Sequence, residues 1–431
     1  MPNLSPLARS RSQANNTGVQ EAALAIIFVA TIVSLYARPF GAKDWQVAAV
    51  GAAFAWVVGP FGLRGGIETA ADSANILAFF LGLMLVAAGA EAAGLYARVA
   101  ELLRARRTAR GRVGLVLVLG VLITAILSND ATPLVLTPAI YAAGAVASRG
   151  TTDSSFAATF TADGASLLLP VSNPVNLLFY ERFEMSFPYY LTTVTPAAAA
   201  GVAAVAFVTW RRVPREREAP EPPRIPFAPT RRSGPALGAV AVLACTYVVG
   251  GLAEVPLGII TLAGGVLLFV AARMGGPVDI RSYRKHVSLG ILVFVASLLI
   301  LVENVVEAGT LDWLTDLLLG LEDYPLAVTI VGAAAVAAVL SNLMNNWPAA
   351  LLLAAIIGAA TGEHEALVVG TLIGSTIGAN FTIVGSLSTV FWLSLARQHG
   401  ASYSAGRYAR LAFAPTLAGI AAACVVAAAA L

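Results

Sequence analysis

Long apolar runs recur along this chain, and short polar segments separate them. Each run has about 17 or more residues, which at about 1.5 Å per helical residue crosses a hydrocarbon core of roughly 30 Å. The runs therefore predict ten membrane-spanning helices. Their expected ranges are 21–38, 46–62, 75–95, 155–180, 188–210, 235–252, 255–272, 288–304, 365–396 and 408–430.

Two further apolar blocks, 113–148 and 325–360, have about twice the length needed for one span. Polar residues interrupt each block half-way, so we expect both blocks to form helical hairpins. Two amphipathic segments, 95–107 and 310–324, precede the hairpins and are typical of helices in the membrane interface. They are candidate arms between a fixed scaffold and a moving core.

The composition supports the same class of protein. Of 431 residues, 58% are hydrophobic and 12% are charged, which is too apolar for an ordinary soluble domain. We therefore expect an all-α polytopic membrane protein. Residues 1–20 lack the compact apolar region of a signal peptide, and we expect them to be a disordered tail.

The chain also matches itself at an offset of about 214 residues. "LSND" at 127–130 aligns with "LSNL" at 340–343, and "GAS" at 164–166 aligns with "GAN" at 378–380. Each half then holds three spans, a hairpin that returns to its own side, and two more spans. Each half thus makes five net crossings of the membrane. Because five is odd, the second copy is inverted relative to the first. The expected units are repeat 1 at 21–210, a cytoplasmic linker at 211–234 and repeat 2 at 235–431.

The basic residues give the orientation, because cytoplasmic loops collect Lys and Arg. With both termini outside, one face receives all of the 27 basic residues except Arg9, Arg11, Arg64 and Arg182. The asymmetry predicts a multi-pass protein of the cell (inner or plasma) membrane. The first hairpin enters from the cytoplasm and the second from outside, as in secondary transporters.

Helix breakers accompany the polar residues in each interrupted segment. In "SNDATP" we expect Thr132 to cap the second hairpin arm, with Pro133 in its first turn. In "SNPV" Asn173 is the expected cap, followed by Pro174. Backbone groups freed at membrane depth need protein or water partners, so these breaks predict a lined site.

The second half repeats the arrangement. Asn345 and Asn346 precede Pro348, and "GANFTIVGS" at 378–386 carries polar residues between two glycines. Four interrupted helices would thus direct their ends to one polar cavity near the midplane. The alternative is that the polar side chains only join helices by hydrogen bonds.

Acidic residues within spans point more directly to transport. A charge at the bilayer centre costs about 2.5–3.5 kcal/mol or more and usually marks a pathway or a proton relay. Asp130 at the first hairpin tip and Asp163 in the broken span at 155–180 are the candidates for proton coupling. A structural capping role is the alternative for both.

At these residues the sequence resembles the arsenite and antimonite efflux permeases of the ion transporter superfamily. The resemblance runs through "SNDATPLVLTPAI", "TADGASLLLPVSNPVNLLFY", "LMNNWPAALLLAAI" and "IGANFTIVGSLSTVFWL", and it covers nearly the whole chain. It implies proton-driven export of trivalent arsenic or antimony hydroxide by an elevator-like movement. The substrate-facing residues that it implies are Ser128, Asn129, Asp130, Asp163, Ser172, Asn173, Asn345, Asn346, Asn380 and Ser386. Thr132, the expected cap at the first hairpin tip, is a further candidate for substrate binding.

This sequence departs from the family pattern at one place. Thr376 and Ala379 stand where the family often has an acidic residue and a proline. Cys245 and Cys424 cannot form a three-thiolate arsenic site, so the hydroxide would be bound by hydrogen bonds.

The resemblance also suggests candidate partners. They are a cytosolic ATPase, found in some systems of the family, and a homodimer, whereas nucleic acid, cofactors and metals are not expected.

The same residues also allow other functions to be compared. A sodium-coupled carboxylate or anion symporter, or a sodium/proton antiporter, would keep the same fold and use the Ser-Asn tips as hard oxygen ligands. An intramembrane enzyme is disfavoured because no HExxH motif is present and the three histidines fall in expected loops. A channel is disfavoured because inverted hairpins suit alternating access.

Overall fold

The computed structural model describes residues 6–60, 65, 73–106, 108–144, 148–214, 233–278, 280 and 287–431. Within these ranges the chain is helical and no strand occurs. Most of the linker expected at 211–234 lies outside the described residues.

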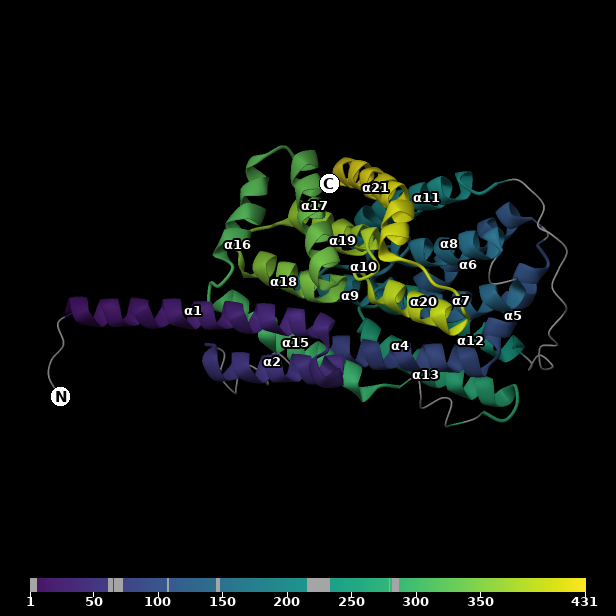
Figure 1. The fold of residues 1–431 in the computed structure, drawn as a ribbon, viewed down its shortest axis with the longest axis horizontal. Coiled ribbons are helices and arrows are strands. Elements are labelled where there is room, and N and C mark those ends of the chain that lie inside the picture. The colour runs from purple at the N-terminus through teal and green to yellow at the C-terminus, as the bar shows by residue number, and fades with distance from the viewer. Residues whose placement is uncertain are drawn as a thin grey trace.

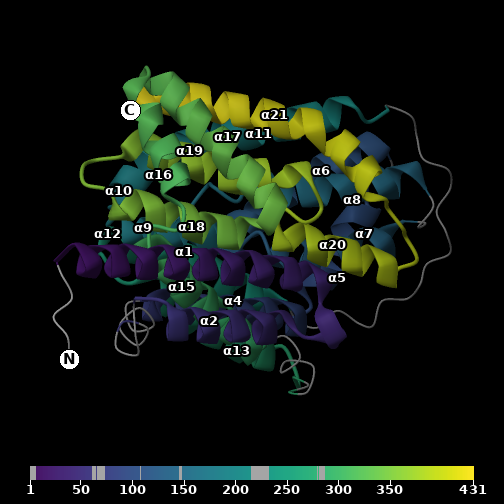
Figure 2. The same cartoon turned by 60° about the vertical axis from the view of Figure 1, so that its left-hand side comes forward.

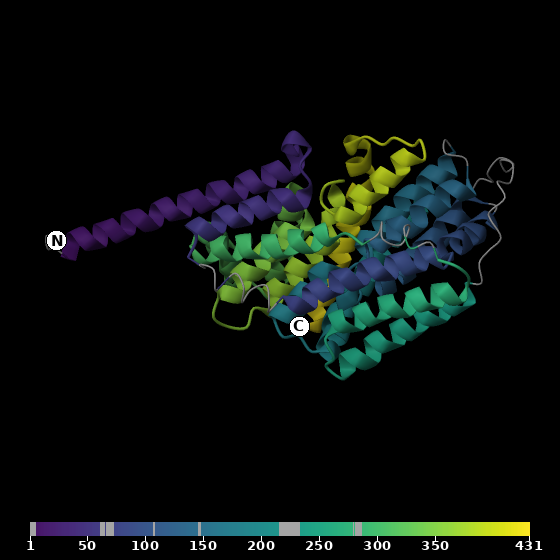
Figure 3. The ribbon, with the colours of Figure 1, turned by 90° about the horizontal axis from the view of Figure 1, so that it is seen from below.

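One layer of the molecule consists of long apolar helices (Figure 1). Figure 3 shows this layer from below, with the N-terminal helix projecting from one end. Its members are α1 (Pro6–Ala37), α2 (Asp44–Val58), α4 (Ala74–Ala92), α12 (Gly234–Leu252), α13 (Leu257–Met274) and α15 (Leu289–Glu307).

The second layer holds both hairpins and both broken spans (Figure 2). Its members are α6 (Ala109–Leu127), α7 (Ala131–Ala143), α8 (Arg149–Gly164), α9 (Pro174–Arg182), α11 (Thr195–Arg211), α17 (Leu326–Met344), α18 (Asn346–Ala359), α19 (Glu365–Thr376), α20 (Leu387–Gln398) and α21 (Ala405–Ala430). Short turns interrupt or extend these helices: η2 (Pro170–Ser172), α10 (Phe187–Tyr189), the π-helical η3 (Tyr190–Val194) and η5 (Gly378–Phe381).

Nine helices among the described residues are long and apolar enough to cross a membrane. Seven of them correspond to expected spans, and the other two are the first arms of the hairpins, α6 and α17. The expected span 46–62 is the shorter helix α2, with 15 residues. The spans 155–180 and 365–396 are interrupted, as expected.

Within each layer, helices from the first half of the chain pack against helices from the second half. In the first layer α4 packs along α13, and α15 packs along α2. In the second layer α7 packs on α20 and α18 packs on α9, while α11 lies against α21. Small residues permit the close approach of α4 and α13, because a Cβ on Gly82 would lie 2.5 Å from the backbone nitrogen of Leu262.

Two short helices connect the layers at equivalent places. The amphipathic segments expected at 95–107 and 310–324 form α5 (Leu95–Arg104) and α16 (Asp312–Leu319), and α16 is followed by η4 (Gly320–Asp323). Each buries two or more apolar side chains, including Leu103 on α5 and Leu318 on α16.

The N-terminal expectation needs a correction. Helix α1 begins at Pro6, so residues 6–20 are helical rather than a disordered tail. The apolar run that starts near residue 21 continues this helical segment. Gly18 lies within the helix and does not end it.

Candidate functional site

The first hairpin turns sharply at Ser128. This residue has a φ of 108°, which ends α6, and the next backbone N–H, that of Asn129, donates to the Ser172 carbonyl at 2.9 Å. The hairpin tip is therefore anchored to the break in the span at 155–180. The Ser128 hydroxyl oxygen is 3.4 Å from the N–H of Ala131 at the start of α7.

Thr132 does not cap α7, contrary to the expectation. The helix begins at Ala131, and the Thr132 hydroxyl instead bonds the Thr124 hydroxyl at 2.7 Å and donates to the Ser128 carbonyl at 3.1 Å. These bonds join the two arms of the hairpin. Pro133 occupies the first turn of α7, as expected, where its missing N–H has no helical acceptor.

The broken span at 155–180 replaces its lost helical hydrogen bonds with side-chain amides. Asn173 caps α9 as expected, because its Oδ1 accepts from the N–H of Val175 at 3.0 Å. Asn176 donates to the carbonyls of Ser166 at 2.6 Å and Leu169 at 2.9 Å. The irregular backbone between α8 and α9 is thus bonded within the protein, as membrane depth requires.

The second hairpin is anchored in the same way. Asn345 has a φ of 76°, and its Oδ1 accepts from the N–H of Trp347 at 3.3 Å, which caps α18. Its Nδ2 donates to the Val384 carbonyl at 3.0 Å, and the N–H of Asn346 donates to the Gly385 carbonyl at 2.8 Å. The second tip therefore contacts the break in the span at 365–396.

The structure shifts the internal alignment by one helical turn at this tip. "LSND" reaches the first turn, but "LSNL" at 340–343 lies inside α17. Asn342 there donates to the Ala338 and Gly378 carbonyls, both at 2.8 Å. The residues that occupy the place of Ser128 and Asn129 are Asn345 and Asn346.

Asp163 is the centre of the site. Its side chain is 1% exposed, and hydroxyl groups from the other half of the chain surround the carboxylate. Oδ1 accepts from Ser386 at 2.7 Å and from Ser388 at 2.8 Å, and Oδ2 accepts from Thr389 at 2.9 Å. The Asn129 amide lies 3.5 Å from Oδ1.

These contacts connect the two hairpin tips through a short path. Asn129 reaches Asp163, Asp163 binds Ser386, and the neighbouring Gly385 carbonyl accepts from Asn346. Both tips and both broken spans therefore meet at one buried polar region. The expected residues Asn129, Ser172, Asn345, Asn346 and Ser386 contribute directly to it.

Two expected residues lie outside this path of contacts. Asp130 is partly exposed, and its carboxylate has no side-chain hydrogen-bond partner among the described residues. Asn380 is fully buried, and it directs its amide to the Phe160 carbonyl at 3.4 Å while its Oδ1 accepts from the Tyr408 hydroxyl. Its polar atoms therefore join η5 to α8 and α21.

Several polar atoms of this region have no partner among the described residues. They are Asn129 Oδ1, Asn173 Nδ2, Asn176 Oδ1 and Trp347 Nε1. Buried polar groups need hydrogen-bond partners. Because these four atoms include both acceptors and donors, and a hydroxyl group can donate and accept, they suit a small ligand rich in hydroxyl groups.

The sequence reasoning missed Ser388, Thr389 and Asn176. Ser388 and Thr389 belong to the first turn of α20, where they are indistinguishable from ordinary helix residues. The one available signal was the concentration of three hydroxyl residues within four positions directly after the break, from Ser386 to Thr389.

The described residues offer little to a metal or to thiolate chemistry. They contain no group of three or more His, Cys, Asp and Glu side chains placed to hold an ion. Cys245 is exposed on α12, whereas Cys424 is buried on α21.

Comparisons with known proteins agree with this architecture. The citrate transporter family model matches residues 19–378. The arsenical pump membrane protein of Escherichia coli K12 is 29% identical over 410 residues, covering 91% of this chain and 94% of that protein. The arsenical pump membrane protein of Yersinia enterocolitica is 28% identical with the same coverage.

A solved structure shares the fold. The Alcanivorax borkumensis YdaH transporter, described as having an unusual topology, superposes with a TM-score of 0.53. The match covers 89% of this chain and 96% of that one at 15% sequence identity.

Proposed function

We propose, from the premise that this chain belongs to the citrate transporter family, that it exports arsenite and antimonite from the cytoplasm as neutral hydroxides. The chain is a multi-pass membrane transporter with nine long apolar helices among its described residues. Relatives named arsenical pump membrane protein match 91% of it.

The observation that carries the choice of substrate is the charge of the site. A citrate-like polyanion needs buried cations, because an unpaired buried anion is strongly destabilised. Among the described residues the buried charged side chains are Asp163 and Arg112. Arg112 lies on α6, 16 residues before the tip, which corresponds to roughly 24 Å along a helix. A carboxylate with hydroxyl and amide neighbours fits a neutral hydroxide better.

The cysteines support binding by hydrogen bonds. Trivalent arsenic is captured tightly by two or three convergent thiolates, whereas Cys245 is exposed and Cys424 is buried on another helix. A hydroxide held by amides and hydroxyls is released readily, which transport requires.

We assign proton coupling to Asp163, with Asp130 as the second candidate. An ionised Asp163 accepts hydrogen bonds from three hydroxyl groups of the second half. A protonated carboxyl must donate one bond itself, so proton binding rearranges the contact between the halves. Asp130, which is partly exposed, would pass the proton on in this proposal.

For the movement we propose an elevator in which the layer with the hairpins slides against the layer of long helices. The exchanged packing of α4 on α13 and of α15 on α2 supports two inverted repeats. The short helices α5 and α16 join the two layers at equivalent places and would act as arms. The inner or plasma membrane location, the outside termini, a homodimer and a cytosolic ATPase subunit belong to the same proposal.

Arsenite uptake into everted membrane vesicles tests this function. We expect uptake when a proton gradient is imposed, loss of uptake when an uncoupler collapses it, and no effect of replacing Na⁺ by K⁺. Uptake that requires Na⁺, or uptake of citrate instead of arsenite, would reject the proposal. Asp163→Asn serves as the inactive control, because it removes the ionisable group while preserving the shape.

A further inference from the structure

One face of α8 connects Asp163 to a hollow at the other end of that helix. Asp153, Phe156, Phe160 and Asp163 follow one another at intervals of three or four residues, so they lie on one helix face. Asp153 and Asp163 are ten residues apart, or roughly 15 Å along the axis. The first three of these residues line the hollow.

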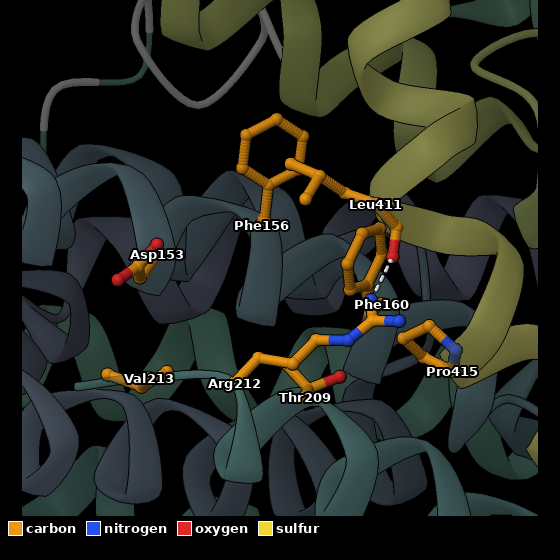
Figure 4. A pocket seen from close by; sticks show the side chains of 8 residues that line it. All are labelled: Asp153, Phe156, Phe160, Thr209, Arg212, Val213, Leu411 and Pro415. Atoms are coloured by element: carbon orange, nitrogen blue, oxygen red, sulfur yellow. Dashed lines mark hydrogen bonds between the residues drawn. The ribbon is translucent and has the colours of Figure 1, made fainter.

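The walls of the hollow come from three helices (Figure 4). Thr209 of α11, with Arg212 and Val213 just beyond it, faces Leu411 and Pro415 of α21 across the α8 side chains. Arg212 reaches over the opening and donates to the Leu411 carbonyl at 2.8 Å. The lining is therefore polar at Asp153, Thr209 and Arg212 and aromatic at Phe156 and Phe160.

Five aromatic rings form one cluster, which includes Phe156 and Phe160 from the wall of the hollow. The ring centre of Phe156 lies 4.9 Å from that of Tyr403 and 5.2 Å from that of Trp392. Phe160 packs edge-on against Tyr408 at 5.6 Å, and all these side chains are buried. Such contacts each stabilise by about 0.5–1.5 kcal/mol, so the cluster resists opening without preventing it.

Polar groups continue on the inner side of this cluster. The Tyr408 hydroxyl donates to Asn380, and the Thr159 hydroxyl bonds Thr389 at 3.2 Å. Thr389 in turn donates to Asp163. Displacement of the Phe160 ring would thus join the polar hollow to a hydrogen-bonded chain that ends at the carboxylate.

We propose that this hollow is the outer vestibule of a water-filled access route to Asp163, and that Phe156 and Phe160 form the gate that closes it. The proposal rests on the proposed function, because it supplies the path by which protons and small hydroxides reach the coupling carboxyl. Arg407, whose guanidinium lies 5.6 Å from the ring centre of Tyr403, covers the aromatic cluster from outside.

Thiol accessibility tests the route without any transport measurement. A reporter cysteine, Ser388→Cys, is placed beside Asp163 after both native cysteines are replaced by serine. A small membrane-impermeant methanethiosulfonate is added from the side on which α11 ends. We expect slow reaction with the intact gate, and about tenfold faster reaction with Phe160→Leu or Phe156→Leu, from the loss of one or two aromatic contacts.

The matched control is Phe179→Leu, which changes a fully buried aromatic residue on α9 outside the route. We expect this variant to leave the reaction rate unchanged. Equal rates in the gate variants and the parent, or equal acceleration by Phe179→Leu, would overturn the proposal. The labelling rates do not depend on arsenite transport. Absence of transport would therefore reject the proposed function and leave the access route to be judged by the labelling rates alone.

Discussion

The hydrogen bond between Thr389 and Asp163 gives the sharpest test of the central site. Thr389→Val removes the hydroxyl that donates to Oδ2 at 2.9 Å and preserves the side-chain shape. A hydrogen bond to a charged group contributes about 1.5–3 kcal/mol, and one between neutral groups about 0.5–1.5 kcal/mol. The substitution should therefore cost about 2 kcal/mol with Asp163 present and about 1 kcal/mol in the Asp163→Asn background. The expected coupling free energy is about 1 kcal/mol.

The chain provides its own probe for this double-mutant cycle. Cys424 is buried, whereas Cys245 is exposed and is replaced by serine. Unfolding in mixed micelles, titrated with a denaturing detergent, exposes the Cys424 thiol to a thiol-reactive fluorophore. The midpoint and slope of this titration give the free energy of unfolding for each of the four proteins.

The control is Thr371→Val, which removes a buried hydroxyl on α19 that has no partner among the described residues. Its effect should add to that of Asp163→Asn within about 0.5 kcal/mol. A coupling below about 0.3 kcal/mol between Thr389 and Asp163 would refute the reasoning, since the hydroxyl cluster would then not hold the carboxylate. Coupling equal to that of the Thr371 control would refute it as well.

Three further outcomes are expected. Asp130→Asn should abolish proton-driven arsenite uptake in everted vesicles and change the free energy of unfolding by less than about 0.5 kcal/mol, because this carboxylate has no side-chain hydrogen-bond partner among the described residues; retained uptake would remove Asp130 from the pathway. Thr132→Val should destabilise the first hairpin by about 1–3 kcal/mol through the loss of its bond to Thr124, and an unchanged unfolding titration would contradict this. Cysteines at Gly406 and Gly320, where no atom lies within 4 Å of an added Cβ, should be labelled from the cytoplasm and from outside respectively, and the reverse labelling would invert the topology.

The sequence alone determined the membrane character, the spans and the places where the helices break. Apolar length is a local property, so seven of ten expected spans are long apolar helices of the structure. The breaks are equally local, because Pro and capping Asn act on their own neighbours. Asn173 and Asn345 therefore cap α9 and α18 next to Pro174 and shortly before Pro348.

The tertiary structure decided which polar residues meet. Asp163 binds Ser386, Ser388 and Thr389, which are 223 to 226 positions away in the chain, and no local pattern encodes such partners. It also distinguishes Asp163 from Asp130, for which the sequence predicted the same role. Asp163 is enclosed by hydroxyl groups, whereas Asp130 is partly exposed. Residue types set the turns, but only the packing of the two halves sets the distances between groups that lie far apart in the chain.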